Sequence, residues 1–278
     1  MKVSVVLQTF NNDNRILKTI NSIRSQKNIK NYEIIIFDDR STNKNFLKYL
    51  KFLSKKYKVK IIRPKKNYFS NNLNPGDFIL KNVKGEFLAF CDPDDYWISK
   101  NKLITQYNFL KNNKNYIACY HYFKFKKNNK IKINTKEIHL STSMFRVSSL
   151  RNIDKKYLKN RKWIQPGDLA LNLIVHDYGL VKKHKKIFSY ISKDITGIWS
   201  EKNEIQQNTS IILCIKNLLN IYKFTNTSLY ARFILINTII RLIKLNSFFI
   251  FKYFLLLLNN LIIVKIIKIK QSQWKKKF

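Results

Sequence analysis

Apolar and polar positions alternate in blocks along about the first hundred residues. Short β-branched runs at 3–9 and 33–37 predict buried strands, and between such runs isoleucine and leucine recur at helical spacing. Further strands are predicted at 59–62 and 86–91, and a helix at 75–83. Because strands alternate with helices and are apolar throughout, the pattern indicates an α/β fold with a mixed, mostly parallel sheet flanked by helices.

The pattern is less regular in the middle of the chain. Two strands are predicted at 116–125 and 130–134 around a Lys-Lys-Asn-Asn turn, followed by an extended stretch at 141–147. A helix is predicted at 167–178 and a short strand at 187–191. These elements extend the α/β pattern without forming an internal repeat.

After Glu204 the composition changes. Residues 205–278 contain no acidic residue and 12 Lys or Arg, and the window 245–264 carries one charge, Lys252. That window has about the length of a membrane span. A polar stripe on the helical wheel favours instead a helix lying in the membrane interface or packed on a partner; its residues are Asn237, Arg241, Lys244, Lys252 and Asn259. A helix packed on the core and a true span are the alternatives. We therefore predict two domains, 1–204 and a helical basic tail, 205–278, that contacts an anionic membrane surface or packs on a partner.

The composition is strongly basic, with 54 Lys and Arg against 16 Asp and Glu and a net charge of +38. Of the basic residues 45 are Lys and nine are Arg, and the chain has 33 Asn, so AT-rich codon usage explains much of the bias. Because Arg is preferred for bidentate contacts to phosphate and guanine, we expect no nucleic-acid partner and keep a nucleic-acid-binding protein only as an alternative. Three scattered Cys, expected to be reduced and buried, exclude a disulfide scaffold.

Acidic residues are so rare in this chain that a cluster of them indicates a structural or functional role. Asp92, Asp94 and Asp95 directly follow a predicted strand. Carboxylates this close repel one another unless a cation binds, and Mg²⁺ and Mn²⁺ prefer carboxylate oxygens together with substrate phosphates. The alternative is an Asp-Pro turn with a helix cap. We predict a Mn²⁺ or Mg²⁺ site in this loop.

Two other acidic positions are candidates for chemistry. Asp38 and Asp39 end a strand, so they should lie at the same sheet edge as the first cluster. They either bind a nucleobase or ribose or cap a helix. Asp168 begins a predicted helix and is either its cap or a carboxylate base. The histidines show no ligand spacing along the chain; they are His121, His139, His176 and His184.

The order of these motifs resembles family 2 glycosyltransferases with the GT-A fold. The resemblance rests on the opening strand and turn at 3–11, the strand with its Asp-Asp-x-Ser-Thr end at 33–42, and the segment 84–97. It covers about residues 2–110 and continues more weakly through Gly167-Asp168 and 197–200.

The resemblance implies an inverting, hexosyltransferase-type enzyme that moves a sugar from a nucleoside diphosphate sugar, with a UDP-sugar expected, to a glycan or lipid-linked acceptor. Such an enzyme would work in surface polysaccharide synthesis, in the cytoplasm and peripheral at the inner face of the cell membrane. By this analogy Asp92 and Asp94 hold the metal and Asp168 is the general base. The residues that would contact the donor are Thr9, Asn11, Asp38, Asp39, Asp92 and Trp199.

The chain also departs from the family pattern. Gly167 replaces an acidic residue that usually precedes the base, and Lys193 and Asp194 stand where a histidine is often found, which puts one metal ligand in doubt. A catalytically silent relative and a nucleotidyltransferase on a related fold are therefore alternatives. The second would need a Gly-rich phosphate loop after the first strand, where this chain has Thr9 to Asn12.

Overall fold

The chain forms two compact units in the computed structural model. The first comprises Met1–Trp163 and Tyr178–Ile195, and the second Ile164–Asp177 and Thr196–Phe278. The predicted domain boundary at residue 204 stays a prediction. The structure describes residues 1–12, 14–71, 73–135, 138–158, 167–192, 202–221, 226–245, 256, 258–261 and 263.

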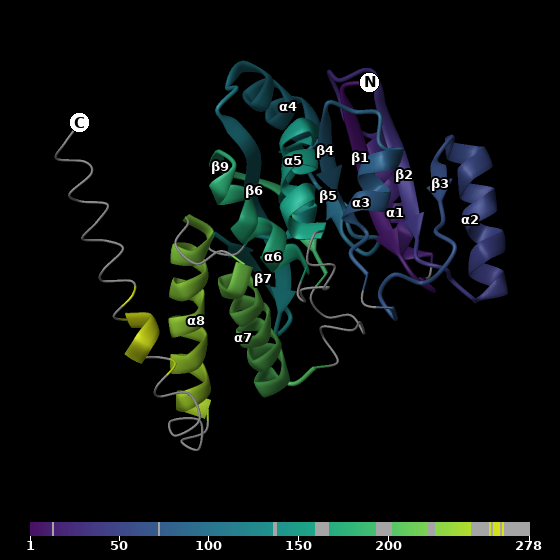
Figure 1. Ribbon diagram of the computed structural model, residues 1–278. Helices are drawn as coiled ribbons and strands as arrows, with labels where there is room; N and C mark the ends of the chain where they lie inside the picture. Colours follow the sequence, from purple (N-terminus) through teal and green to yellow (C-terminus); the bar gives the residue numbers. More distant parts are fainter. Residues whose placement is uncertain are drawn as a thin grey trace. The chain divides into compact units, whose positions relative to one another are not determined.

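A nine-stranded mixed sheet forms the centre of the first unit (Figure 1). Its order is β3-β2-β1-β4-β8-β6-β9-β5, and β7 pairs with β6. The strands are β1 (Val3–Thr9), β2 (Tyr32–Asp38), β3 (Lys60–Ile62), β4 (Phe87–Phe90), β5 (Tyr96–Trp97), β6 (Tyr116–Lys127), β7 (Lys130–Asn134), β8 (Met144–Arg146) and β9 (Leu180–Ile191). β3, β2, β1 and β4 are parallel, as are β6 and β9, whereas the other pairs are antiparallel. The predicted α/β fold with a mixed sheet is confirmed.

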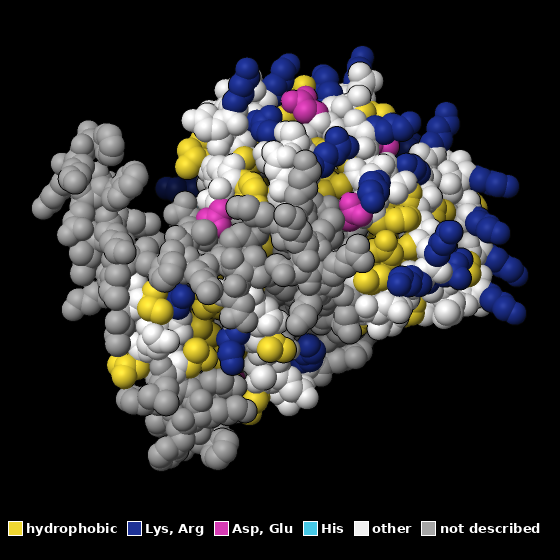
Figure 2. Space-filling view, viewed as in Figure 1, with side chains coloured by type: hydrophobic (Ala, Val, Ile, Leu, Met, Phe, Trp, Pro, Cys, Tyr) yellow, Lys and Arg dark blue, Asp and Glu magenta, His cyan; other side chains and the backbone are white. Residues whose placement is uncertain are grey.

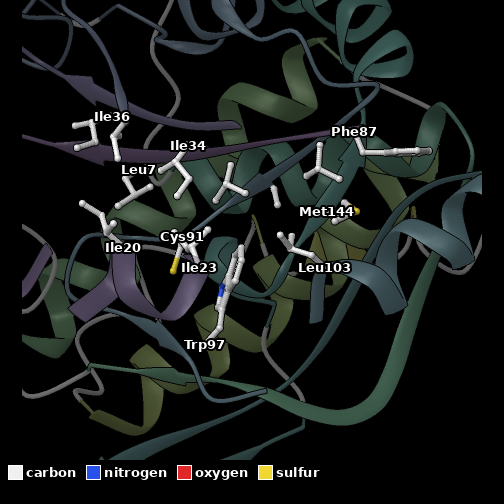
Figure 3. Close-up of a cluster of buried hydrophobic side chains, with 14 of the residues drawn as sticks. Leu7, Ile20, Ile23, Ile34, Ile36, Phe87, Cys91, Trp97, Leu103 and Met144 are labelled. Carbon is white, nitrogen blue, oxygen red and sulfur yellow. The ribbon is translucent and has the colours of Figure 1, made fainter. Parts of the chain in front are cut away.

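One hydrophobic core joins the sheet to three helices, α1 (Arg15–Arg24), α2 (Lys44–Tyr57) and α4 (Lys102–Asn112). In Figure 3 Leu7 and Ile36 of the sheet lie beside Ile20 of α1. On α1 the apolar residues recur at helical spacing and form one buried stripe. Burial of each isoleucine side chain stabilises the folded state by about 1.5–3 kcal/mol. The core thereby fixes the strand ends that carry the acidic residues.

Two other helices, α3 (Gly76–Asn82) and α5 (Val147–Leu158), pack against each other. Phe78 of α3 contacts Phe37 of β2, with ring centroids 5.9 Å apart. Before β4 the backbones approach closely, since a Cβ on Gly85 would lie 2.3 Å from the backbone nitrogen of Ser4. Only glycine fits there, which lets β4 pair with β1.

Several elements differ from their predicted bounds. β9 begins at Leu180 rather than 187, because it pairs with β6 over most of its length. The stretch predicted as extended at 141–147 contains the short helix η1 (Leu140–Thr142), then β8, then the first residue of α5. The cap of α2 is Asn43, whose side chain accepts from the Phe46 N–H, and not Asp38 or Asp39.

The described part of the second unit is helical, and the tail was predicted to be helical. It contains α6 (Gly167–Ile174), η2 (Val175–Asp177), α7 (Glu204–Ile221) and α8 (Asn226–Leu245). Arg241 on α8 forms a 2.6 Å ion pair with Glu204 on α7, and Leu218 and Ile239 are fully buried. No helix among the described residues is long and apolar enough to cross a bilayer. Most of the window 245–264 lies outside the described residues.

Basic side chains cover much of the visible described surface, and acidic ones are few (Figure 2). The three cysteines, Cys91, Cys119 and Cys214, are free and buried, as predicted. His121 is also fully buried in its strand, where Nδ1 lies 2.9 Å from the Tyr122 carbonyl. These residues therefore belong to the core.

Candidate active site

The carboxyl ends of β2, β1 and β4 lie side by side. Thr9 at the end of β1 pairs with Asp38 at the end of β2. β4 pairs with the other side of β1, and the Cys91 N–H, just before Asp92, donates to the Val6 carbonyl. The two acidic clusters therefore flank the end of β1, at the edge where such sheets bind ligands.

Asp38 and Asp39 both bind groups of the protein. Asp38 is fully buried, accepts from the Ser41 hydroxyl and forms a 2.8 Å ion pair with Nε of Arg63. The carboxylate of Asp39 accepts from the backbone N–H groups of residues 68–69 at 2.6 and 3.0 Å. These contacts shape the loops after β2 and β3, and a direct contact of either aspartate with a donor stays a prediction.

Asn11 and Thr9 lie beside these carboxylates. Asn11 has a φ of 46°, and its side-chain oxygen accepts from the N–H groups of Thr42 and Asn43 at 2.8 and 3.0 Å. The Thr9 hydroxyl is buried and has no hydrogen-bond partner among the described residues. A buried hydroxyl without a partner is unfavourable, so Thr9 is suited to bind a polar ligand atom.

The acidic loop, residues 92–95, joins β4 to β5. Asp95 is 2% exposed, and its two oxygens accept from the Ser141 hydroxyl at 2.6 Å and from the Ser192 N–H at 2.9 Å. Asp92 and Asp94 are half-buried. The loop thus has a buried carboxylate that is held by hydrogen bonds and two that are nearer to solvent.

Ser141 connects this loop to the core. Its hydroxyl also accepts from the Asp92 N–H at 2.9 Å, and its carbonyl accepts from the indole N–H of Trp97 at 3.1 Å. Trp97 is 3% exposed within the core cluster (Figure 3). Neither Ser141 nor Ser192 was predicted as a site residue, because serines carry no spacing signal in a single sequence.

His139 is the other residue that the sequence did not identify. Its Nε2 lies 3.9 Å from a carboxylate oxygen of Asp92, and its Nδ1 lies 3.6 Å from one of Asp95. One ligand atom from each of these three residues lies within 4.8 Å of the others. The histidine follows the β6–β7 hairpin, which returns the chain to the loop, so no local spacing could reveal the contact.

Burial controls the protonation of Asp95. It raises the pKa of this carboxyl to about 7, the nearby Asp92 and Asp94 raise it as well, and His139 and the Ser141 hydroxyl lower it. A divalent cation in the loop would favour the ionised form. Among the described residues, the oxygen and nitrogen atoms of Asp92, Asp95 and His139 therefore fit a metal ion chemically.

The remaining predicted residues are Asp168 and Trp199. Asp168 lies in the first turn of α6, in the second unit, and one of its oxygens accepts from the Leu169 N–H at 2.8 Å. Its role as a base stays a prediction. Trp199 lies outside the described residues, as do Lys193 and Asp194.

The profile of glycosyl transferase family 2 matches residues 4–172. The chain belongs to this family. That match includes β1, the acidic loop and Asp168, and so agrees with the resemblance of the motifs.

Relatives and solved structures extend the comparison. The chain is 33% identical over 121 residues to the Escherichia coli UDP-Glc:alpha-D-GlcNAc-diphosphoundecaprenol beta-1,3-glucosyltransferase WfaP. The aligned segment covers 44% of this chain and 46% of WfaP. The chain thus spans less than half of that relative.

Two solved structures share the fold. Staphylococcus aureus TarS 1–349 in complex with UDP-GlcNAc is similar with a TM-score of 0.61 at 19% identity, over 88% of this chain and 73% of that one. The mannosyltransferase PcManGT from Pyrobaculum calidifontis, in complex with GDP-Man and Mn²⁺, has a TM-score of 0.55 at 10% identity, over 85% and 72%. The predicted GT-A-type fold is confirmed.

Proposed function

We propose that this family 2 protein is an inverting glycosyltransferase that moves a hexose from a nucleoside diphosphate sugar, most simply a UDP-sugar, to a hydroxyl group. The observation that carries the proposal is the meeting of Asp92, Asp95 and His139 beside the strand ends that carry Thr9 and Asp38. A carboxylate-rich loop at the carboxyl ends of parallel strands suits a diphosphate with its counter-ion. The UDP-GlcNAc complex of TarS supports the donor class.

The proposed metal ligands are Asp92 and Asp94, with His139 as a further ligand. The Ser141 N–H donates to Nδ1 of His139 at 3.3 Å and holds the imidazole beside Asp92, and the nearby Asp95 would add negative charge next to the ion. Mg²⁺ takes oxygen ligands, so a histidine ligand favours Mn²⁺ over Mg²⁺. When bound, the ion would supply electrostatic stabilisation of the diphosphate leaving group.

The remaining roles follow from the same chemistry. Thr9, Asn11, Asp38 and Asp39 would position the nucleoside, directly or by holding the loops after β2 and β3, and Trp199 would pack on a sugar. Asp168 would accept the proton from the acceptor hydroxyl as that oxygen attacks the anomeric carbon. Attack on the side opposite to the departing diphosphate inverts the anomeric centre.

A lipid-linked or glycan acceptor is proposed from the activity in the name of WfaP. We propose a role in surface polysaccharide synthesis, at the cytoplasmic face of the cell membrane. The supporting feature is the tail, residues 205–278, which has 12 Lys or Arg and no acid. Such a segment is attracted to anionic lipid headgroups.

The test is transfer or hydrolysis of UDP-sugars in the presence of Mn²⁺. Asp94→Asn and Asp168→Asn should each lower the rate on the order of a hundredfold or more, since each removes a group that acts in the transition state. Asp77→Asn is the matched control, because Asp77 lies on α3, outside the acidic loop, and pairs with Lys81 in a 2.7 Å contact. Unchanged rates in both site variants would overturn the assignment.

Donor binding gives a separate measurement. A bound UDP-sugar should raise the melting temperature of the wild type with Mn²⁺ present, because a ligand stabilises the folded state that binds it. The shift should be smaller in Asp94→Asn and retained in Asp168→Asn and Asp77→Asn.

A further inference from the structure

A tight, strongly basic hairpin projects from the sheet of the first unit. β6 and β7 are joined by Asn128 and Asn129, which have φ values of 51° and 56°. Two successive residues with positive φ form the type I′ turn, whose twist matches that of the strands. The hairpin, residues 124–133, is thus a defined structural element and not a loose loop.

Its charges are all of one sign. Residues 116–135 contain no acid, and the register places Lys127 directly opposite Lys130. Like charges in such a cross-strand pair are destabilising. The hairpin lysines are Lys124, Lys126, Lys127, Lys130 and Lys132. An external anionic surface would relieve this repulsion.

The hairpin also exposes large apolar side chains. Ile131 and Ile133 are 67% and 51% exposed. They lie opposite Lys126 and Lys124 in the register, so isoleucines and lysines share one face. Lysines on an edge strand are sufficient to prevent pairing with other chains. This role accounts for the lysines but not for the exposed isoleucines. Apolar side chains flanked by lysines fit a bilayer interface, where lysines contact phosphates and isoleucines enter the acyl boundary.

The hairpin lies at the end of the sheet that carries the acidic loop. Phe125 of β6 pairs with Ile191 of β9, and the next residue, Ser192, donates to Asp95. The Phe123 ring also lies 6.0 Å from that of His139. A membrane bound to the hairpin would therefore lie near the candidate site.

We propose that the hairpin, residues 124–133, docks on a bilayer that contains acidic phospholipids. The occupant is a lipid surface, since a soluble phosphate polymer would use the lysines and leave Ile131 and Ile133 in water. This contact does not depend on the tail, residues 205–278, or on the proposed sugar transfer.

A fluorophore on the hairpin tests the contact directly. Ile131→Cys can be labelled with a polarity-sensitive dye, because the three native cysteines are buried. Phe52→Cys is the matched control, since Phe52 is 49% exposed on α2. With phosphatidylglycerol-containing vesicles, emission should shift to the blue and rise several-fold at position 131 and stay unchanged at position 52. Neutral phosphatidylcholine vesicles should have no effect.

Three results would overturn the proposal. The first is the absence of a shift at position 131 in protein that co-sediments with the vesicles, which would leave binding to the tail. The second is an equal shift at position 52. The third is the same response to soluble polyphosphate, which would indicate a phosphate polymer as the partner.

A charge variant gives an independent readout. Replacing Lys126, Lys127 and Lys130 with Gln should weaken vesicle binding on the order of a hundredfold, or roughly fivefold per lysine. The control is the same change at three exposed lysines of α2, which are Lys48, Lys51 and Lys55. Equal losses in the two triple variants would contradict a hairpin contact. UDP-sugar hydrolysis without vesicles should match the wild type, so the result is separable from failure of the proposed activity.

Discussion

Nδ1 of His139 lies 3.6 Å from the buried carboxylate of Asp95, which belongs to the acidic loop. The pair places a nitrogen ligand where sequence patterns indicated only carboxylates. For the proposed metal site, a nitrogen ligand predicts a preference for Mn²⁺ over Mg²⁺ that can be measured.

Replacing His139 with Gln should weaken Mn²⁺ binding. Loss of an imidazole beside Asp92 should raise the Mn²⁺ concentration for half-maximal activity tenfold or more, whereas dependence on Mg²⁺ should change less, because Mg²⁺ prefers oxygen. Metal titrations of activity and calorimetry of Mn²⁺ binding measure both effects. His184→Gln on β9 is the control, and identical metal curves for the two variants would exclude His139 as a ligand.

Replacing Ser141 with Ala should disturb the acidic loop without removing a charge. The change leaves Asp95 without one hydrogen bond and the Asp92 N–H without its acceptor, at about 1–3 kcal/mol of unfolding free energy. We expect a lower turnover and weaker Mn²⁺ binding as well. Ser143→Ala serves as the control, since its hydroxyl makes one long contact of 3.3 Å to the His139 carbonyl. A loss of stability with full metal affinity would show that Ser141 does not position the loop.

Replacing Arg63 with Met should destabilise the first unit. Asp38 is fully buried, so removal of its 2.8 Å partner leaves an unpaired charge, at about 3 kcal/mol. The double variant with Asp38→Asn should recover part of that loss. Urea unfolding provides the measurement, with Arg151→Met on α5 as the exposed control. Additive effects of the two single changes would contradict the pairing.

Replacing Lys102 with Met should stabilise the protein in a pH-dependent way. Burial lowers the pKa of Lys102 from 10.5 to about 7, and Nζ has no hydrogen-bond partner among the described residues. Nζ lies 4.0 Å from the ring centroid of Trp97, but a cation–π contact worth about 2 kcal/mol is too weak to compensate for burying an unpaired ammonium.

The sign of this effect follows from proton binding. Between pH 7 and 10.5 the unfolded chain binds the Lys102 proton and the folded chain does not, so wild-type stability rises with pH in that range. The advantage of Lys102→Met should be largest at pH 7 and below, by a few kcal/mol at most, and should disappear as the pH approaches 10.5. Denaturant titrations at several pH values measure it, with exposed Lys111→Met as the control. A pH-independent difference would mean that Lys102 is charged when folded.

The sequence predicted the parts of the site that depend on one strand and its end. β1 spans Val3–Thr9 as predicted, because a short β-branched apolar run strongly favours a strand. The acidic loop follows β4, as predicted from the end of its apolar run. His139 and Ser192 reach that loop through the pairing of β6 with β7 and β9. Such pairing between distant segments has no signature in the spacing of residues. β5 is two residues long and therefore has no detectable pattern. α5 begins directly after β8, so the prediction of an extended stretch at 141–147 ran into the first residue of the helix.

Ser141 holds the acidic loop in place before any ligand binds. Its hydroxyl and carbonyl tie the acidic loop to Trp97 and hence to the core, independently of any ion. An ion and a diphosphate would therefore enter a backbone that is already ordered, without the entropy loss of folding a loop around them. By the proposed function, the same rigidity would keep the aspartates close together after the diphosphate departs, and their repulsion would favour binding of the next cation-bound donor.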